Sequence, residues 1–334
     1  MKYAVIGLGA VGSIVGGILT KSDKNVILIG KKNQVEVINN HGLKINGING
    51  SFLLKNKNAS SDLTSLEDVD LIIICVKSQD TENLAYTIKD HIKKSALILS
   101  LQNGVRNSNI LNRITGIKTI SGVVLFNALY SKPGEVTLTI RGGLLIKEDS
   151  SYKKEIEGLI NSFNKEGLSS KSDTNIEEYK WSKLIVNLQN AVTALTDQTI
   201  KESIIDSYTR SILIATMEEG INILEKSGIK TKPLPDMDPK KIIKRLKKYN
   251  TIFLKIGSKL MRLKNAKNSM WQSLSRSKKT EIDYINGEIV NLANKNNIQA
   301  PINTKLVQLI KEIEATHIKR IYKPYELKEI LNIK

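Results

Sequence analysis

The chain has 334 residues, more than one hydrophobic core usually holds, so its length favours two domains. Hydrophobic residues make up 40% and charged residues 25%, which is typical of folded globular proteins and excludes a disordered or low-complexity chain. The net charge of +18 raises the question of nucleic-acid binding, but the basic residues are mostly Lys spread along the chain and aromatic residues are only 5%, so we predict solvated surface lysines and no nucleic-acid partner.

The N-terminus begins as a signal peptide does, with Met1-Lys2 followed by an apolar run. Five glycines interrupt that run, the polar residues 21–24 end it, and it has no clear small-x-small cleavage site. No later stretch approaches the ~18 apolar residues that a membrane-spanning helix needs. We therefore predict a folded N-terminus and no membrane partner.

A glycine-rich turn follows the first predicted strand, residues 3–6. The turn is Gly7-Leu8-Gly9-Ala10-Val11-Gly12, a G-x-G-x-x-G motif that leads into a predicted helix. In this motif Gly7 allows a tight turn, Gly9 lets the backbone approach a pyrophosphate, and Gly12 lets the helix touch the strand. The N–H groups at the start of the helix bind the phosphate. A purely structural turn can carry the same letters, but the second apolar strand at 25–29 supports a dinucleotide site.

The residues after that second strand bear on the choice of cofactor. NAD-binding proteins usually carry Asp or Glu there, to hold the ribose 2′-hydroxyl group. This chain has Gly30-Lys31-Lys32, and two ammonium groups would attract the 2′-phosphate that a carboxylate would repel. The sequence therefore favours NADPH/NADP+, although Lys31 and Lys32 could also be two more solvated lysines.

Further strands alternate with helical segments. Continuous apolar runs at 71–76 and 96–101 are typical of parallel strands buried on both faces, and a helical stretch at 80–93 separates them. Strand-like runs at 121–129 and 135–147 flank a turn at Pro133-Gly134. The alternation predicts an α/β fold with a Rossmann-type, doubly wound parallel sheet.

The only cysteine, Cys75, lies in one of these apolar runs, so we interpret it as a core residue and not as a nucleophile. One cysteine excludes an internal disulfide, and no Cys/His cluster indicates a metal site. This composition is typical of a reduced, cytoplasmic protein.

Helical periodicity dominates from residue 176 onward. One apolar face contains Leu184, Leu188, Ala191 and Leu195, and a second contains Ile282, Ile285, Ile289 and Leu292. The polar stretch 169–173 is the predicted boundary, so we expect a nucleotide-binding domain at 1–171 and an all-α domain at 172–334. The basic, amphipathic segment 239–267 could lie on a membrane surface, but a solvated Lys face over a buried apolar stripe explains it better.

Five motifs in order resemble the ketopantoate reductase (2-dehydropantoate 2-reductase) family. They are the glycine turn at 7–12, the strand 70–78 that includes Lys77, residues 101–105, residues 181–187, and residues 268–287. The resemblance covers nearly the whole chain. It implies an NADPH-binding Rossmann-type domain followed by a helical domain, and reduction of the 2-oxo acid ketopantoate to (R)-pantoate on the route to pantothenate and coenzyme A. The oligomeric state is left open, with a homodimer as one option.

The resemblance also implies roles for particular residues. Lys31 matches the family's basic residue for the 2′-phosphate, and Lys77 and Asn103 line the cofactor and substrate cleft. Lys183 matches the catalytic lysine and Glu281 the active-site glutamate, which also lies beside the cofactor. Asn187 and Ser269 match substrate-binding residues.

The chemistry of ketone reduction agrees with a lysine at this position. Hydride delivery leaves negative charge on the ketone oxygen, which needs a proton donor or cation within hydrogen-bond reach. Lys183, Asn187 and Asn190 are spaced i, i+4 and i+7, which places them on one polar helix stripe. The alternative is an ordinary solvent-facing side of a helix. Glu281 could bind the substrate hydroxyl, orient Lys183, or form a surface pair with Lys278.

Departures from the family pattern concern the substrate. Many members have a second Asn eight residues after the lysine, where this chain has Ala191, and Asn190 could take that role. Ala266 and Ser273 stand where the family often has Asn and Asp, and Asn265 or Asn268 could compensate. Two alternatives therefore stay open: a paralogous reductase of another 2-oxo acid, and a non-catalytic NADPH-binding regulator.

Overall fold

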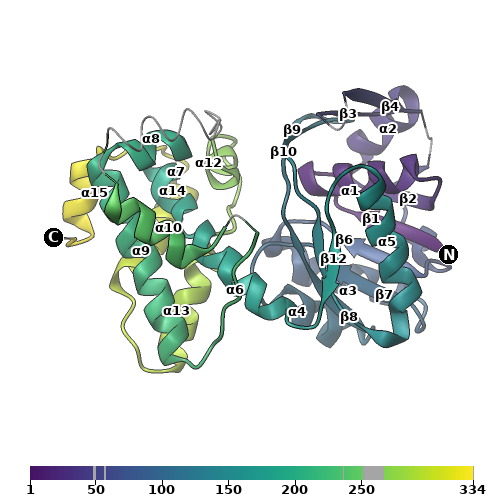
Figure 1. Ribbon diagram of the computed structural model, residues 1–334. Coiled ribbons are helices and arrows are strands. Elements are labelled where there is room, and N and C mark those ends of the chain that lie inside the picture. Colours follow the sequence, from purple (N-terminus) through teal and green to yellow (C-terminus); the bar gives the residue numbers. More distant parts are fainter. Residues whose placement is uncertain (48–49, 56–57, 236, 250, 252–266, 334) are drawn as a thin grey trace. The chain divides into compact units, whose positions relative to one another are not determined.

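The computed structural model describes residues 1–334 except 48–49, 56–57, 236, 250, 252–266 and 334. Contacts divide the chain into an N-terminal unit, Met1–Ile176, and a C-terminal unit, Glu177–Lys334 (Figure 1). The polar stretch 169–173, predicted to be the domain boundary, contains strand β12 (Lys171–Asp173), which pairs in parallel with β11 (Leu144–Lys147). An edge strand is held by backbone hydrogen bonds and tolerates polar side chains, so its sequence carries no apolar signal.

The N-terminal unit is built on an eight-stranded sheet in the order β12-β11-β8-β7-β6-β1-β2-β5. Its other strands are β1 (Lys2–Ile6), β2 (Asn25–Ile29), β5 (Ala59–Ser60), β6 (Leu71–Ile74), β7 (Leu97–Ser100) and β8 (Thr119–Val124). Neighbours from β8 to β5 are parallel, which confirms the predicted Rossmann-type sheet. β11 runs antiparallel to β8, so this end of the sheet departs from the parallel pattern.

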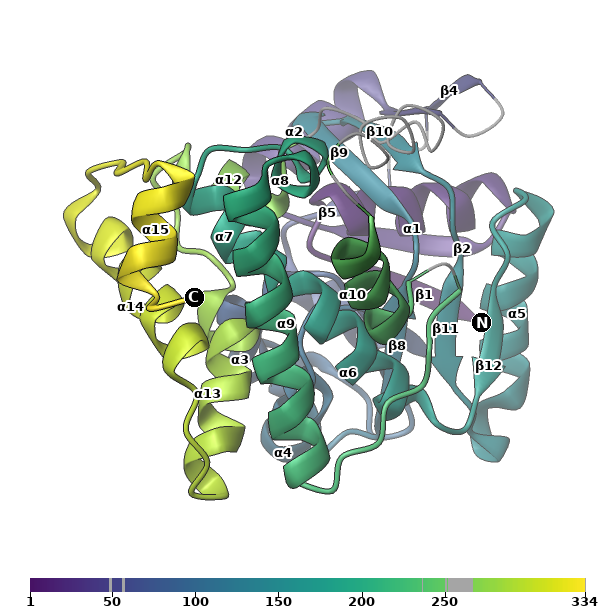
Figure 2. The ribbon, with the colours of Figure 1, turned by 60° about the vertical axis from the view of Figure 1, so that its left-hand side comes forward.

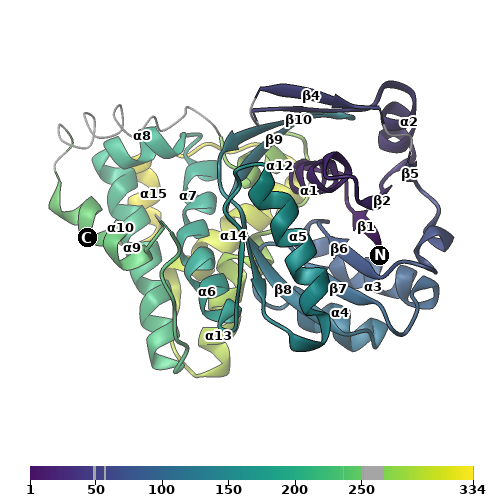
Figure 3. The ribbon, with the colours of Figure 1, turned by 45° about the vertical axis from the view of Figure 1, so that its right-hand side comes forward.

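Helices cover both faces of this sheet (Figure 3). Side chains alternate along each strand: Val5 and Ile73 join the core under α1 (Ala10–Lys21) and α5 (Lys153–Lys165). Ala4 and Ile72 join the core under α3 (Thr81–Ile88) and α4 (Asn107–Thr115). Burial on both faces explains why β1 and β6 are continuous apolar runs. The remaining helices of the unit are α2 (Lys32–His41), η1 (Leu63–Leu66), η2 (Ser78–Asp80), η3 (Lys89–His91) and η4 (Ser150–Tyr152).

A second, four-stranded sheet packs on α1 and was not predicted from the sequence. Its order is β4 (Ser51–Leu54), β3 (Leu43–Asn46), β10 (Glu135–Ile140) and β9 (Asn127–Lys132). The predicted turn at Pro133-Gly134 does join β9 to its antiparallel neighbour β10. Gly17 permits the close approach of α1, since a Cβ there would lie 2.0 Å from the Ile45 side chain.

The described part of the C-terminal unit is helical, as predicted. Its helices are α6 (Ile176–Asn187), α7 (Gln189–Leu195), α8 (Ile200–Ile205), α9 (Ser207–Lys226), α10 (Pro239–Lys248), α12 (Ser269–Leu274), η5 (Ile282–Tyr284), α13 (Asn286–Lys295), α14 (Pro301–Thr316) and α15 (Pro324–Ile330). α9 is the central helix and contacts α7, α8, α10, α13, α14 and α15 (Figure 2). Both predicted apolar faces are buried, except that Leu292 is only half-buried.

The basic segment 239–267 is described only in part. In α10, Ile243 and Leu246 are buried while the lysines are exposed, which agrees with a solvated Lys face over an apolar stripe. Phe253, Ile256 and Leu260, assigned to the same stripe, lie outside the described residues. Across the described chain, the helices are too short or too polar to cross a lipid bilayer.

Candidate active site

The glycine turn joins β1 to α1, and each of its glycines has a distinct environment. Gly7 has a positive φ of 99°, and a Cβ there would lie 2.7 Å from the Val76 backbone nitrogen. A Cβ on Gly12 would lie 2.1 Å from the Gly7 carbonyl oxygen, so only glycine lets helix and strand meet. A Cβ on Gly9 would meet nothing within 4 Å. The backbone at Gly9 therefore borders open space, as an approaching pyrophosphate requires.

The N-terminus of α1 is suited to an anion. Gly9 is the N-cap residue, and no side chain caps the helix. The first N–H groups of a helix have no partner within it, and they carry the positive end of the helix dipole. Cys75 lies under this turn, and burial raises the pKa of its thiol, which supports a core role and not a nucleophilic one.

Lys31 follows β2 and is the exposed N-cap residue of α2. A residue that the sequence analysis missed, Gln34, ties it to the glycine turn. The Lys31 backbone N–H donates to Gln34 Oε1 at 3.2 Å, and Gln34 Nε2 donates to the Leu8 carbonyl at 2.8 Å. Gln34 Nε2 also donates to the Tyr130 hydroxyl on β9 at 3.0 Å. The only local signal was a Gln three residues after the N-cap position.

Lys77 and Asn103 lie in the loops that follow the adjacent parallel strands β6 and β7. Lys77 is exposed and Asn103 is half-buried. The glycine turn follows β1, the other neighbour of β6. Within the N-terminal unit, the structure thus gathers the predicted cofactor residues along one edge of the sheet, where ligands of such folds bind.

In the C-terminal unit, α6 and α7 carry the polar stripe. The backbone stays helical between them, because the Leu188 N–H bonds to the carbonyls of Leu184 at 3.1 Å and Ile185 at 3.3 Å. Lys183 and Asn187 are half-buried and Asn190 is 8% exposed. The Asn190 side-chain amide has no hydrogen-bond partner among the described residues.

Lys183 and Glu281 form an electrostatic pair. Burial lowers the pKa of Lys183 to about 8, and the negative charge of Glu281 opposes that shift. Glu281 is only 8% exposed, so it does not sit on the surface as a pair with Lys278 would require. A lysine whose pKa lies near physiological pH can both give up and regain a proton.

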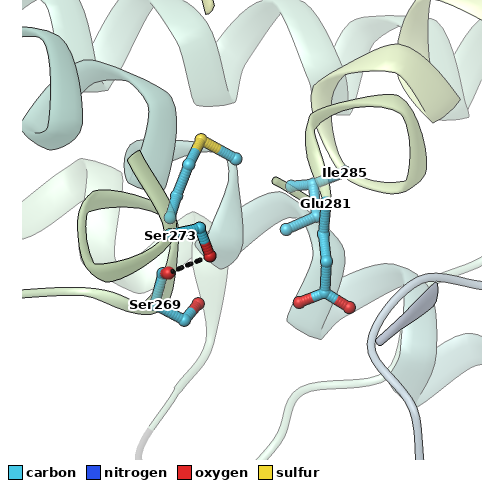
Figure 4. Close-up of a pocket in the computed structure, with 5 residues that line it drawn as sticks. Ser269, Ser273, Glu281 and Ile285 are labelled. Atoms are coloured by element: carbon cyan, nitrogen blue, oxygen red, sulfur yellow. Dashed lines mark hydrogen bonds between the residues drawn. The ribbon is translucent and has the colours of Figure 1, made fainter. Parts of the chain in front are cut away.

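Glu281 also lines a narrow pocket with Ser269, Met270, Ser273 and Ile285. The Ser269 hydroxyl and the Glu281 carboxylate lie on opposite sides of it (Figure 4). Ser273 Oγ donates to the Ser269 carbonyl at 3.0 Å, which helps to fix the first turn of α12. The residues around this pocket are both polar and apolar.

The structure describes some of the positions that concern the departures from the family pattern. Ala191 is fully buried, so that position is in the core. Asn268 is not available to a substrate: its Oδ1 accepts the Trp271 N–H at 2.8 Å, and its Nδ2 donates to the Asn190 carbonyl at 3.0 Å and to Thr193 Oγ1. Asn268 is therefore the N-cap that anchors α12 to α7. Asn265 and Ala266 lie outside the described residues.

Comparisons with known proteins agree over both units. The family model described as ketopantoate reductase PanE/ApbA matches residues 3–150, and its C-terminal counterpart matches residues 175–314. The 2-dehydropantoate 2-reductase of Pyrococcus horikoshii is 33% identical over 320 residues, which cover 94% of this chain and 98% of that protein. The enzyme of the same name from Pyrococcus abyssi is 32% identical over 327 residues, which cover 96% and 100%.

Solved structures share the fold. The crystal structure of a PanE/ApbA family ketopantoate reductase from Ralstonia eutropha JMP134 is similar with a TM-score of 0.82, at 31% identity, over 95% of this chain and 99% of that one. A D-mandelate dehydrogenase in a ternary structure with NADH and anilino(oxo)acetate has a TM-score of 0.78 at 24% identity, over 95% and 99%. At that identity, the second likeness concerns the fold alone.

Proposed function

The chain belongs to the ketopantoate reductase family, and on that premise we propose that it reduces ketopantoate to (R)-pantoate with NADPH. It is an oxidoreductase, as its relatives are. The observation that carries the proposal is Lys183, whose pKa burial lowers to about 8, beside the buried carboxylate of Glu281. A solvent-facing lysine would have neither feature.

The residues of the N-terminal unit fit a dinucleotide. The open space at Gly9 and the uncapped start of α1 suit a pyrophosphate, and Lys31 would pair with a 2′-phosphate. Lys77 and Asn103, on the neighbouring loops, would bind further along the same edge of the sheet. When bound, the nicotinamide supplies the hydride for the ketone carbon.

In our proposal, Lys183 acts on the ketone oxygen. Its ammonium group stabilises the charge that develops there and donates a proton to it. Glu281 favours the charged form of Lys183 before transfer and accepts a hydrogen bond from the substrate hydroxyl. Asn187, Asn190 and Ser269 would bind the remaining polar atoms of the substrate, and the amide of Asn190 has no partner among the described residues that would compete.

Preference for NADPH over NADH is part of the proposal and rests on charge. Lys31 and Lys32 are exposed at the end of β2, where no carboxylate follows the strand. An ammonium group paired with a phosphate contributes roughly 1.5–3 kcal/mol. The single cysteine suits a reducing compartment, so we place the reaction in the cytoplasm; a homodimer stays a prediction.

The structure bears differently on the two alternatives to this function. Ser273, which lines the pocket, changes the family pattern there, and this would suit a paralogue that reduces another 2-oxo acid. A non-catalytic NADPH-binding regulator would need the glycine turn but not a buried Lys183–Glu281 pair, so that pair favours an enzyme.

The test is NADPH oxidation by the full chain with ketopantoate beside a panel of smaller and larger 2-oxo acids, and the same assays with NADH. We expect ketopantoate to give the highest kcat/KM and NADPH to be strongly preferred. If a different 2-oxo acid is reduced more efficiently, the proposed substrate is wrong, but the assignment as a reductase stands. NADPH binding without turnover of any 2-oxo acid would favour the regulator.

A further inference from the structure

A buried hydrogen-bond network lies beneath the loops that follow β6 and β7. We call it the loop network; its side chains are Ser78, Thr81, Ser100, Gln102 and Asn107, each at most 7% exposed. Buried polar groups are costly unless they are paired, and a fully connected network is rigid. These five lie at the sheet edge that carries the predicted cofactor residues, so their placement calls for an explanation.

One side of the loop network holds the backbone of Asn103. Its carbonyl accepts hydrogen bonds from Ser78 Oγ at 2.9 Å and from Asn107 Nδ2 at 2.5 Å. Asn107 Nδ2 also donates to Ser78 Oγ at 3.1 Å. Two donors on one carbonyl fix the orientation of that peptide group, and with it the direction in which the Asn103 side chain leaves the loop.

The other side holds the segment before Lys77. Gln102 Nε2 donates to the Val76 carbonyl at 3.1 Å, and Ser100 Oγ donates to Gln102 Oε1 at 3.0 Å. The backbone of Val76 is also the surface against which Gly7 packs. The network therefore reaches all three loops at this edge, those after β1, β6 and β7.

Thr81 joins the two sides. Its hydroxyl accepts from Gln102 Nε2 at 2.6 Å and donates to Asn107 Oδ1 at 3.0 Å. We propose that Thr81 and Asn107 are positioning residues that hold Asn103, Lys77 and the glycine turn in the arrangement that the cofactor requires. The proposal rests on the function proposed above, since it assigns these three loops to cofactor binding.

Thr81→Val tests the proposal, because it keeps the shape of the side chain and removes both hydrogen bonds. We expect NADPH affinity and kcat/KM to fall by about tenfold to a hundredfold, the scale of a misplaced binding group. Thr81→Ser retains the hydroxyl and should restore most of both. The matched control is Ser108→Ala, which removes a buried hydrogen bond from Ser121 Oγ to Ser108 Oγ at 2.8 Å, one residue after Asn107 on α4.

A purely structural role predicts a different result. Thr81→Val and Ser108→Ala would then lower the melting temperature alike and leave NADPH affinity, measured by fluorescence titration, and kcat unchanged; that outcome would overturn the proposal. The proposal would also be overturned if Thr81→Ser lowered NADPH affinity and kcat/KM as much as Thr81→Val does. If Thr81→Val does not fold, Ser78→Ala removes one of the two bonds to the Asn103 carbonyl. Ser78→Ala should weaken NADPH binding several-fold, and an unchanged NADPH affinity would contradict the proposal.

The two proposals can fail separately. If the unmodified protein turns over no 2-oxo acid but binds NADPH, the proposed reaction fails, and the Thr81 variants still test the loop network through NADPH affinity. If the unmodified protein is active and Thr81→Val equals it in affinity and kcat, the reaction stands and the loop network has only a structural role.

Discussion

Lys183→Met should remove most of the reductase activity and at the same time stabilise the fold. Burial lowers the pKa of Lys183 from 10.5 to about 8, so the folded protein holds this cation less well than the unfolded chain does. One pKa unit corresponds to about 1.4 kcal/mol, so the charged lysine costs the folded state roughly 3–4 kcal/mol. Met has a similar length and no charge, and it packs well in irregular spaces.

The pH dependence of that stability gain has a definite sign. Below about pH 8, Lys183 is charged in both the folded and the unfolded state, and the full cost is present. Between about pH 8 and 10.5 the unfolded chain binds more protons than the folded one, so the stability of the unmodified protein rises with pH. The advantage of Lys183→Met should therefore shrink across this interval.

Urea unfolding at about pH 7 and about pH 10 measures the stability difference, and ketopantoate-dependent NADPH oxidation measures turnover. We expect kcat to fall about a hundredfold or more in Lys183→Met, with little change in NADPH affinity. In the unmodified enzyme, kcat/KM should decline as pH rises through about 8, because the proton donor is lost. Lys230→Met, at an exposed position without an ion pair among the described residues, is the control and should change neither quantity.

Two results would refute this reasoning. If Lys183→Met is no more stable than the unmodified protein at about pH 7, and both respond to pH alike, burial does not penalise the Lys183 charge. If turnover is unchanged, Lys183 is not the proton donor, and its helix returns to an ordinary structural role.

The remaining predictions concern cofactor and substrate. Lys31→Glu should weaken NADPH binding by roughly 1.5–3 kcal/mol and narrow or reverse the preference over NADH, and equal affinity for both in the unmodified protein would contradict the assignment. Asn190→Ala should raise KM for ketopantoate by an amount that corresponds to about 1–3 kcal/mol of lost binding free energy, and NADPH binding should not change. If Asn190 is only a solvated residue, the binding free energy of ketopantoate should change by no more than about 0.5 kcal/mol. Gly9→Ala should fold with a nearly unchanged melting temperature, because its Cβ meets open space, but should lose NADPH affinity in a titration, whereas Gly12→Ala should destabilise the fold itself.

Local signals in the sequence were enough for the glycine turn and the main strands. Two-faced burial makes β1 and β6 continuous apolar runs, and the positive φ of Gly7 and the crowded Gly12 require the residues that the motif names. The apolar helix faces of the C-terminal unit could also be predicted, because a 3.6-residue period is visible in the sequence without knowing which elements the helix packs against.

Other features depend on contacts between distant residues. β12 is polar, and its strand character comes from backbone pairing with β11 alone. Thr81 and Asn107 have ordinary helix-start letters, and only the sheet order brings them together across 26 residues of chain. The shifted pKa of Lys183 likewise arises from burial in the folded unit, which no spacing along α6 reveals.

The second sheet has a consequence for the order of folding. β3 pairs in parallel with β10, so Lys44 meets Glu135 only after the chain has closed a long loop, and such closures are slow. α1 packs on this sheet, and Gln34 reaches from the glycine turn to Tyr130 on β9. A nascent chain on the ribosome that ends before residue 127 would carry the complete phosphate-binding turn but would lack β9 and β10, two of the four strands in the sheet that packs on its helix. We therefore expect nucleotide-binding competence to appear late in synthesis, although its motif is translated almost first.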